Sequence, residues 1–427
     1  MEFTTPLTEC LKCGHSLTVS TGRSLGATLF GLGGTAPCFH QKKRCSKKRC
    51  GASYSCNYVV DNGFKRNSLT IAQLEHLGVV FVHPTEAFEI RYLRYREELL
   101  FRATSAQAIH YAGNEVLFER KVPLRWWREL YYDALMYYLA VRELPLSYAK
   151  EIVIGDEISP DALVAYDAET HEQFATDNAG CTVLSMDGRE KVFMKCSADE
   201  GRPKRSGAPR KDGVRKPFYN GWFMVVNPEN SKVVCVLPEY EPEGNNIRIQ
   251  AIGKVIGSFP EVDALVHDNI CKCEQRMRAL PKFSGIDFYI VDRFHAYRHS
   301  KKCRCNPWFR KRLNARIKGV NTSVSEQVFF WFRKYSSIIN PMRQQRHRFL
   351  VLLFCKKHNR LCKSGAPPYL NAHTWQKSAR KTGKKYACST GTGGKKVKPS
   401  LKKPITNSRK VGSAATRGNV RAQDRKG

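Results

Sequence analysis

Three short, mainly apolar segments of this chain end on an acid, a pattern that can deliver carboxylates to one edge of a sheet. The acids are Asp187, Asp268 and Asp292, and a fourth, Glu326, opens a stretch with helical periodicity. Mg²⁺ prefers oxygen ligands, and two such ions about 3.5–4 Å apart can clamp the attacking and leaving oxygens of phosphoryl transfer. We therefore expect Asp187, Asp268 and Glu326 to hold Mg²⁺ or Mn²⁺ and to be catalytic.

A single aspartate at a strand end is more often a turn or capping residue than a ligand. The combination of two strand ends and one helix in the right order is what favours a metal site. Asp292 would end a strand that lies one position further from the first strand in the sheet. We expect it to support the site from outside rather than to bind the metal directly.

A second group of possible ligands follows Asp292. His295 and His299 are four residues apart and precede a Cys-x-Cys pair, Cys303 and Cys305. Residues four apart share one face of a helix, so imidazoles and thiolates could bind zinc there. Another Cys-x-Cys pair, Cys271 and Cys273, comes directly after Asp268. Separate roles in packing and DNA contact explain these residues equally well, and the sequence leaves the choice open.

The N-terminal segment contains a further set of metal-binding residue types. Cys10 and Cys13 form a Cys-x-x-Cys pair followed by glycine, and Cys45 and Cys50 supply a second pair. Four thiolates suit a closed tetrahedral zinc site, which is structural because it has no open position for water. Cys56 or His40 could substitute for one ligand. Lysines and arginines between residues 42 and 49 would suit a phosphate backbone.

Composition narrows the class of protein. The chain of 427 residues has 72 basic and 38 acidic residues, a formal charge of +34, which is typical of proteins that bind nucleic acid. The longest apolar run, 349–355, is too short to span a membrane, and no secretory signal is evident. Sixteen cysteines in a reducing compartment indicate metal ligands more than disulfides, although isolated ones are expected to be buried apolar residues.

The elements that must position the acids predict an α/β fold. Strand 182–186, hairpin strands 221–226 and 233–237, helix 246–258, strand 264–266, helix 271–280, strand 288–291 and helices 324–337 and 346–357 follow one another. This is the order of an RNase H-like domain with a mixed sheet. We expect the domains to be a zinc module at 1–60, a mainly helical region at 61–175, the catalytic domain at 176–366 and a disordered basic tail at 367–427.

The helical region interleaves basic and aromatic residues, for example over 92–101 and 126–135. Direct DNA contact is one interpretation. We favour the other, in which the aromatic side chains pack inside and the arginines are solvated.

The string Asp-Arg-Phe-His-x-x-x-His-x-x-x-Cys-x-Cys-Asn-Pro, starting at Asp292, is followed by Asn-x-Ser-x-x-Glu-Gln, which contains Glu326. Together these resemble the catalytic core of the KDZ (Kyakuja-Dileera-Zisupton) DNA transposases. The match covers roughly residues 180–360. The resemblance implies an RNase H-like, acid-triad active site with Asp187, Asp268 and Glu326 as the triad, and a cysteine cluster N-terminal to it.

We therefore expect a nuclear DNA transposase, or a protein derived from one, that cleaves and joins DNA as a homo-oligomer without membrane contact. The main alternative is a non-catalytic, zinc-dependent DNA-binding protein that keeps the fold. An RNA-processing nuclease with the same metal site is a third possibility. Basic runs in the tail, such as 395–398, could serve nuclear import or non-specific attraction to DNA.

Overall fold

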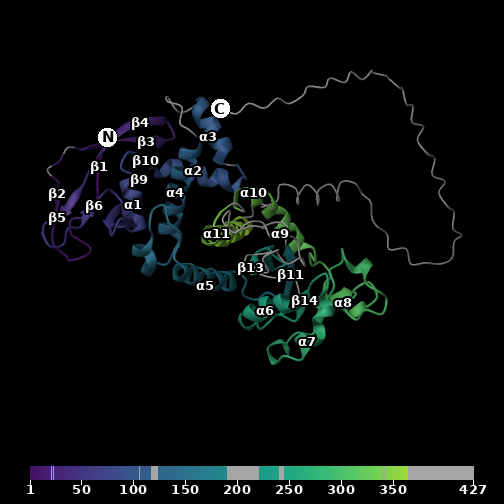
Figure 1. The fold of residues 1–427 in the computed structure, drawn as a ribbon. Helices are drawn as coiled ribbons and strands as arrows, with labels where there is room; N and C mark the ends of the chain where they lie inside the picture. Colours follow the sequence, from purple (N-terminus) through teal and green to yellow (C-terminus); the bar gives the residue numbers. More distant parts are fainter. Residues whose placement is uncertain are drawn as a thin grey trace, which may run out of the picture. The chain divides into compact units, whose positions relative to one another are not determined.

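The computed structural model describes residues 1–20, 22, 24–104, 106–116, 124–189, 221–239, 245–339 and 342–363. The tail expected over 367–427 lies outside the described residues. By their contacts, residues Met1–Gln376 belong to one compact unit. Its described part is a mixture of helices and three five-stranded sheets, two of which contain both parallel and antiparallel pairs (Figure 1).

Two of these sheets come from the first 89 residues. The N-terminal sheet has the order β1-β4-β3-β10-β9, from β1 (Glu2–Thr4), β4 (Gly34–Gln41), β3 (Leu25–Gly31), β10 (Glu86–Glu89) and β9 (Val79–His83). The cysteine sheet has the order β2-β5-β6-β7-β8, from β2 (Leu17–Val19), β5 (Lys43–Cys45), β6 (Ser53–Tyr54), β7 (Tyr58–Asp61) and β8 (Phe64–Asn67).

The division expected at residue 60 falls inside β7. Strands β8, β9 and β10 lie in the region expected to be mainly helical. Four residues of β9 are buried, and a short apolar run of this kind cannot be assigned to strand or helix by periodicity alone. The first 60 residues also contribute to a large core, through Leu29 and Phe30 of β3.

The helical region packs most of its described aromatic residues inside, although Tyr95 and Tyr111 are exposed. Its elements are α1 (Ile71–Leu77), α2 (Ile90–Phe101), α3 (Ala106–Val116), α4 (Leu124–Glu143), a 3₁₀ turn (Leu146–Glu151) and α5 (Pro160–Asp177). Tyr92, Tyr131 and Tyr138 are fully buried. Arg96, which was expected to be solvated, is buried too. Its guanidinium lies 4.5 Å from the ring centroid of Tyr92, a cation–π contact that offsets part of the cost of burial.

The C-terminal sheet has the order β13-β12-β11-β14-β15. Its strands are β11 (Val183–Arg189), β12 (Gly221–Val226), β13 (Val233–Glu239), β14 (Ala264–Val266) and β15 (Phe288–Ile290). β12 runs antiparallel to both β11 and β13, whereas β14 is parallel to β11 and β15 is parallel to β14. β12 and β14 have the bounds expected from the sequence. β13 ends two residues later than expected, and β15 ends one residue earlier. β11 begins one residue later than expected and ends three residues later.

Helices flank this sheet and follow it. They are α6 (Asn245–Val255), α7 (Glu274–Arg278), α8 (Lys311–Arg316), α9 (Val324–Arg333), α10 (Ser336–Ile339) and α11 (Gln344–Lys363). Short 3₁₀ turns lie at Ile256–Ser258, Ile270–Lys272, Pro281–Phe283 and Ala296–Arg298.

The two faces of the C-terminal sheet belong to different cores. Phe223 and Val225 of β12 face the core that α6 covers, with Ala251 and Ile252. The alternate β12 residues Trp222 and Met224, by contrast, join the core that contains α9 and α11. Figure 1 shows α6 and α11 on opposite sides of the strands. The strands can therefore be almost continuously apolar, because both faces are covered.

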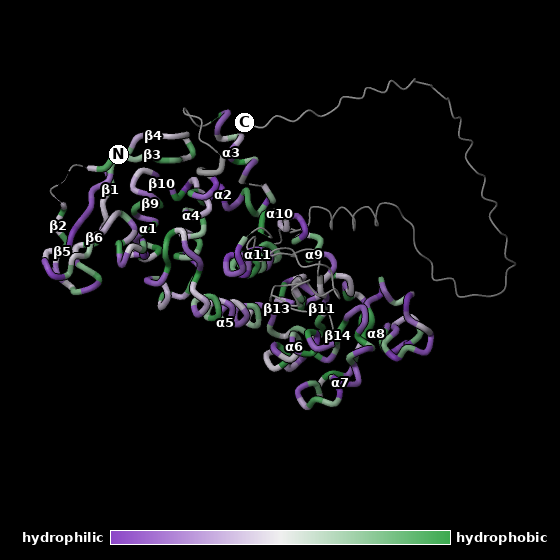
Figure 2. The backbone as a smooth tube through the Cα atoms, in the orientation of Figure 1, coloured by the Kyte–Doolittle hydropathy of each residue, from purple (hydrophilic) through white to green (hydrophobic). Residues whose placement is uncertain are grey.

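Helix α11 joins the C-terminal sheet to the helical region. Its middle, 349–355, is buried, while its ends are polar, a change in hydropathy that can be followed in Figure 2. It contacts β13 and α5, and Phe354 packs edge-on against Phe101 of α2. One core thus extends from β3 to α11, so the expected domains share their interior within this unit.

Candidate functional site

The expected acids lie together in one cleft. This cleft at the edge of the C-terminal sheet is lined by residues from β11, from the segments after β14 and β15, and from the start of α9. The lining residues are Ser185, Met186, Asp187, His267, Asp268, Asp292, His295, Thr322, Ser325 and Glu326. The structure therefore brings together all three residues of the expected triad, and it adds Asp292 and His295.

Strand register explains why three aspartates meet at this edge. Ser185 of β11 pairs with Val266 of β14, and Val266 pairs in turn with Ile290 of β15. Each aspartate stands two residues beyond one of these paired positions. Because β11, β14 and β15 are parallel, their carboxyl ends meet at the same edge. Asp268 and Asp292 lie just beyond β14 and β15, as expected, whereas Asp187 lies inside β11, which continues to Arg189 in its pairing with β12. The three residues are equivalent in register.

Helix α9 adds the fourth carboxylate. Glu326 lies in its first turn, and the preceding residue, Ser325, is buried with its hydroxyl 3.0 Å from the hydroxyl of Ser185 on β11. Val328, Phe329 and Phe332 form the buried apolar side of the helix. This packing holds the first turn of α9 over the ends of the strands.

Asp268 is held in its ionised form. Burial by itself raises the pKa of a carboxyl group, but contact with His267 and the charges of His267, Arg248 and His295 together lower the pKa of Asp268 to about 2. The Nδ1 atom of His267 lies 2.7 Å from Asp268 Oδ1 and also 2.9 Å from the backbone N–H of Asn269, which donates to it. One ring nitrogen cannot donate and accept at once. Nδ1 of His267 therefore either donates to the carboxylate of Asp268 or accepts from the backbone N–H of Asn269.

Asp292 is engaged by a histidine on both carboxylate oxygens. The backbone N–H of His295 donates to Oδ1 at 3.0 Å, and the Nδ1 atom of its ring lies 2.7 Å from Oδ2. Asp292 is buried, and both it and His295 line the cleft. A carboxylate in this arrangement orients an imidazole. A supporting position for Asp292 stays a prediction, while His295 lies in the cleft and not in the group with Cys303.

The three acids are less tightly gathered than the ligands of one ion. Among the described residues, two groups of three or more histidine, cysteine or acidic residues have ligand atoms within 4.8 Å of one another, and both groups contain cysteines. The cleft carboxylates form no such group. Carboxylates repel one another without a cation between them. In a two-metal site, moreover, they need not all share one ion.

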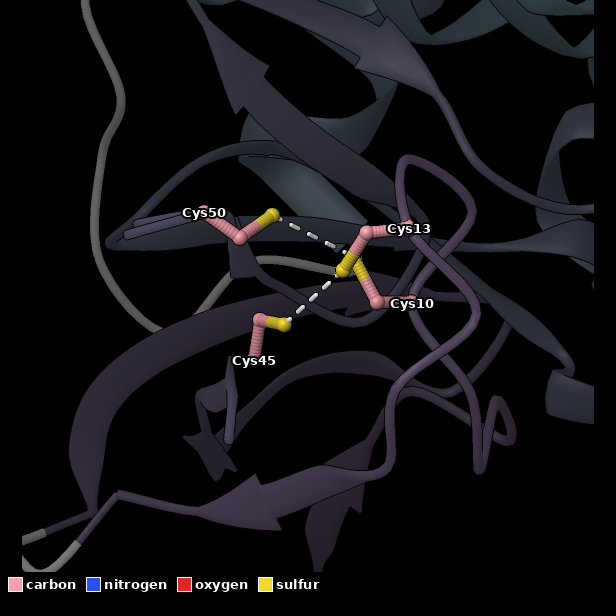
Figure 3. A group of neighbouring side chains, drawn as sticks. All are labelled: Cys10, Cys13, Cys45 and Cys50. Carbon is pink, nitrogen blue, oxygen red and sulfur yellow. Dashed lines mark hydrogen bonds between the residues drawn. The ribbon is translucent and has the colours of Figure 1, made fainter. Parts of the chain in front are cut away.

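The first of these two groups consists of the four N-terminal cysteines. Cys10, Cys13, Cys45 and Cys50 point toward one another in Figure 3. The Sγ atoms of Cys10 and Cys50 lie 3.7 Å apart, and those of Cys13 and Cys45 lie 3.4 Å apart. Tetrahedral zinc with Zn–S bonds of about 2.3 Å separates its sulfur ligands by about 3.8 Å. The cluster could therefore hold a metal ion such as Zn²⁺.

Tight turns form this cluster. The N–H groups of Cys13 and Gly14 donate to the carbonyl of Cys10, and Gly14 has a φ of +72°, which favours glycine. Burial tends to raise the pKa of the Cys10 thiol, but the Tyr54 hydroxyl and backbone N–H groups lower it, whereas burial raises the pKa of Cys45 in the same cluster.

The proposed substitute ligands lie elsewhere. Cys56 is buried in the large core with Cys38. His40 is buried as well, and its Nε2 atom lies 2.9 Å from the carbonyl oxygen of Pro84. The spacing in the sequence favoured the four cysteines that cluster, and neither substitute lies among them.

The second group joins Cys271, His299 and Cys303. The sequence placed His299 and Cys303 near each other but left the role of Cys271 open. Cys305 and Cys273 make other contacts, with Glu274 and with the carbonyl of Ile270.

Several cleft residues were not anticipated. They are Ser185, His267, Thr322 and Ser325, all next to or near an expected acid. Alternation along β11 could have indicated Ser185, since residues two apart in a strand share a face.

No protein-family model and no curated protein matches this chain. In the described residues, no helix is both long and apolar enough to cross a membrane.

Proposed function

We propose that this protein is a metal-dependent polynucleotidyl transferase, a DNA transposase or a derivative of one, with Asp187, Asp268 and Glu326 as its catalytic residues. The observation that carries the proposal is the cleft in which β11, the segment directly after β14 and the first turn of α9 present these acids. The strand order of the C-terminal sheet, with two antiparallel and two parallel pairings, agrees with an RNase H-like domain.

The residues present suit divalent cations. Asp187, Asp268 and Glu326 offer the hard oxygen ligands of Mg²⁺ or Mn²⁺, and the low pKa of Asp268 keeps that ligand deprotonated. Bound ions would activate an oxygen nucleophile and stabilise the charge on the leaving oxygen. Asp292 would orient His295, and Ser185 would hold the start of α9 so that Glu326 stays in place.

The surface next to the cleft suits a nucleic acid. The segment from Arg293 to Arg312 exposes large aromatic side chains together with cations. The exposed aromatic residues are Phe294, Tyr297, Trp308 and Phe309, and the exposed cations include Arg298, Lys301, Lys302 and Arg304. Stacking on bases and attraction to phosphates are how proteins hold DNA strands. The four-cysteine cluster, as a zinc site, would add rigidity to the basic segment at 42–49.

We keep one alternative, a non-catalytic DNA-binding protein that retains this fold. The spacing of the cleft carboxylates, wider than that of the cysteine groups, favours it.

A cleavage assay on labelled duplex DNA with Mg²⁺ or Mn²⁺ distinguishes the proposed enzyme from the non-catalytic DNA-binding protein. The test compares the unchanged protein with Asp187→Asn, Asp268→Asn and Asp287→Asn. Asp287 is exposed at the opposite end of β15 and is the matched control. Metal-dependent cleavage or joining that both cleft variants lose and the control keeps supports the proposal. DNA binding without cleavage by any of the four proteins supports the alternative. Joining of ends into a second duplex distinguishes a transposase from a plain nuclease.

A further inference from the structure

Cys271, His299 and Cys303 come together from two segments that follow neighbouring strands. Cys271 lies in the 3₁₀ turn three residues after Asp268, at the end of β14. His299 and Cys303 lie beyond β15, in the segment that begins with Asp292. The Nδ1 atom of His299 lies 3.6 Å from Cys271 Sγ and 3.7 Å from Cys303 Sγ.

These distances suit shared coordination better than hydrogen bonding. A tetrahedral zinc ion with Zn–S of about 2.3 Å and Zn–N of about 2.0–2.1 Å separates a sulfur from a nitrogen ligand by about 3.6 Å. As an acceptor, a single imidazole nitrogen has one lone pair, so it cannot accept from two thiols at once. A cation between the three atoms satisfies all of them.

The surroundings hold these ligands in place. The buried side chain of Asn306 donates to the carbonyls of Ala296 and His299, at 3.0 and 3.1 Å, which fixes the loop that carries His299. The N–H of Cys303 donates to the carbonyl of Ser300, which closes a turn between His299 and Cys303. Exposed cations flank the two thiols in sequence, namely Lys272, Lys302 and Arg304.

The neighbouring cysteines are already engaged. Cys305 Sγ lies 3.1 Å from Glu274 Oε2, and Cys273 Sγ lies 3.3 Å from the carbonyl oxygen of Ile270. Both are buried, whereas the three clustered residues are half-buried. The fourth coordination position is thus left to solvent.

We propose that Cys271, His299 and Cys303 bind a second metal ion of the zinc class, distinct from the one at the four-cysteine cluster. Bound there, it fastens the segment after β14 to the segment after β15. Those segments carry Asp268 and the Asp292–His295 pair, so the ion would keep that edge of the cleft rigid. The inference stands on the ligand geometry and does not depend on the proposed activity.

Metal content of the full-length protein tests the inference directly. We expect two zinc ions per chain by elemental analysis, and one in each of the variants Cys45→Ser, Cys271→Ser and Cys303→Ser. The matched controls Cys273→Ser and Cys305→Ser keep both. A single zinc ion in the unchanged protein, or loss of an ion in either control, overturns the assignment of these three ligands.

A variant that preserves the ligand set guards against misfolding. His299→Cys is expected to keep two ions, whereas His299→Gln keeps one. In cobalt-substituted Cys45→Ser protein, replacing His299 with Cys should strengthen the thiolate-to-cobalt absorption, because a third sulfur replaces the nitrogen. An unchanged spectrum means that His299 is not a ligand and overturns the proposal. A disulfide between Cys271 and Cys303, detected by a mass two hydrogens lower than that of the dithiol, also overturns it.

Discussion

At the scale of single residues, the cleft gives its acidic side chains different surroundings. Asp268 is partly buried beside His267 and has a lowered pKa, so it is available as an anion. Asp292, at the equivalent position of the next strand, is buried and engaged by His295 on both oxygens. Equivalent positions on parallel strands can therefore take different roles, because the segments that follow the strands supply different partners.

Exchange of Asp292 for asparagine should affect stability more than catalysis. The Asp292→Asn variant cannot accept on both side-chain atoms, so we expect a loss of about 1–3 kcal/mol in the free energy of unfolding. Any metal-dependent cleavage should fall by about tenfold or less, against about 100-fold or more for Asp268→Asn, since a direct metal contact is worth several kcal/mol. Urea unfolding and cleavage rates measure the two effects. Equal losses of activity in both variants would make Asp292 a direct ligand.

At the scale of elements, the placement of α9 decides whether Glu326 reaches the cleft. The hydroxyl groups of Ser185 and Ser325 contact each other in a buried position between β11 and the first turn of α9. The apolar residues of α9 supply most of the attraction, and the hydroxyl pair specifies the position of its first turn along the strand.

A double-mutant cycle tests this pair. Each of Ser185→Ala and Ser325→Ala leaves a buried hydroxyl without its partner, so we expect each to cost about 1–3 kcal/mol. The double variant should cost less than the sum of the two, because neither hydroxyl remains. Urea unfolding gives all three values.

Ser323→Ala is the matched control for the cycle, since Ser323 occupies the N-cap position of α9 without a side-chain capping bond. Its effect should be small. Strict additivity of the two single changes would show that the hydroxyl contact does not contribute.

The cysteine sheet depends on its cluster in a similar way. Only a few buried apolar residues surround the four thiols, among them Ala52, Tyr54 and Val59. We expect Cys13→Ser to lower the melting temperature and to leave the chain with one zinc ion fewer than the unchanged protein. The control Cys38→Ala lies in the large core and should keep its metal. If Cys13→Ser and Cys38→Ala both lose a metal ion, or if both keep it, the assignment of the four clustered cysteines as ligands is wrong.

At the scale of the whole molecule, one apolar core runs from the N-terminal sheet to α11 within the compact unit. Two histidines of α11, His347 and His358, are buried within it. Trp222 donates through Nε1 to His347 Nε2 at 3.0 Å, and the opposite ring nitrogen lies 3.0 Å from the carbonyl oxygen of Ile339. His347 must therefore be neutral to keep both contacts.

This burial makes stability depend on pH. Desolvation lowers the pKa of His347 to about 4 from an ordinary value of 6.5, and it lowers that of His358 to about 4 as well. Below pH 6.5 the unfolded chain binds protons at these positions that the folded chain does not. Stability should therefore fall as the pH drops from 6.5 to 4, by at most about 3 kcal/mol for each residue.

Urea unfolding between pH 4 and pH 7 measures this slope. His347→Gln should reduce it, and the exposed residue His76 supplies the matched control, His76→Gln. A slope that is the same in all three proteins would mean that His347 is not buried in its neutral form.

Much of the site could be predicted from the sequence, because its signals are local. An apolar run that ends on an acid is contained in five residues, and the two strands expected at 221–226 and 264–266 have those bounds in the structure. The spacing of Cys10, Cys13, Cys45 and Cys50 likewise indicated the four residues that cluster. Each of these patterns depends on the residues that immediately surround it.

Only the tertiary structure decided which side chains share a partner. The register of three parallel strands placed Asp292 beside Asp268, the loop after β15 turned His295 toward Asp292 and His299 toward Cys271, and β9 joined a sheet that the sequence did not indicate. Such pairings depend on contacts between residues far apart in the chain. Local periodicity carries no information about them, because burial and strand pairing are settled only when the whole core packs.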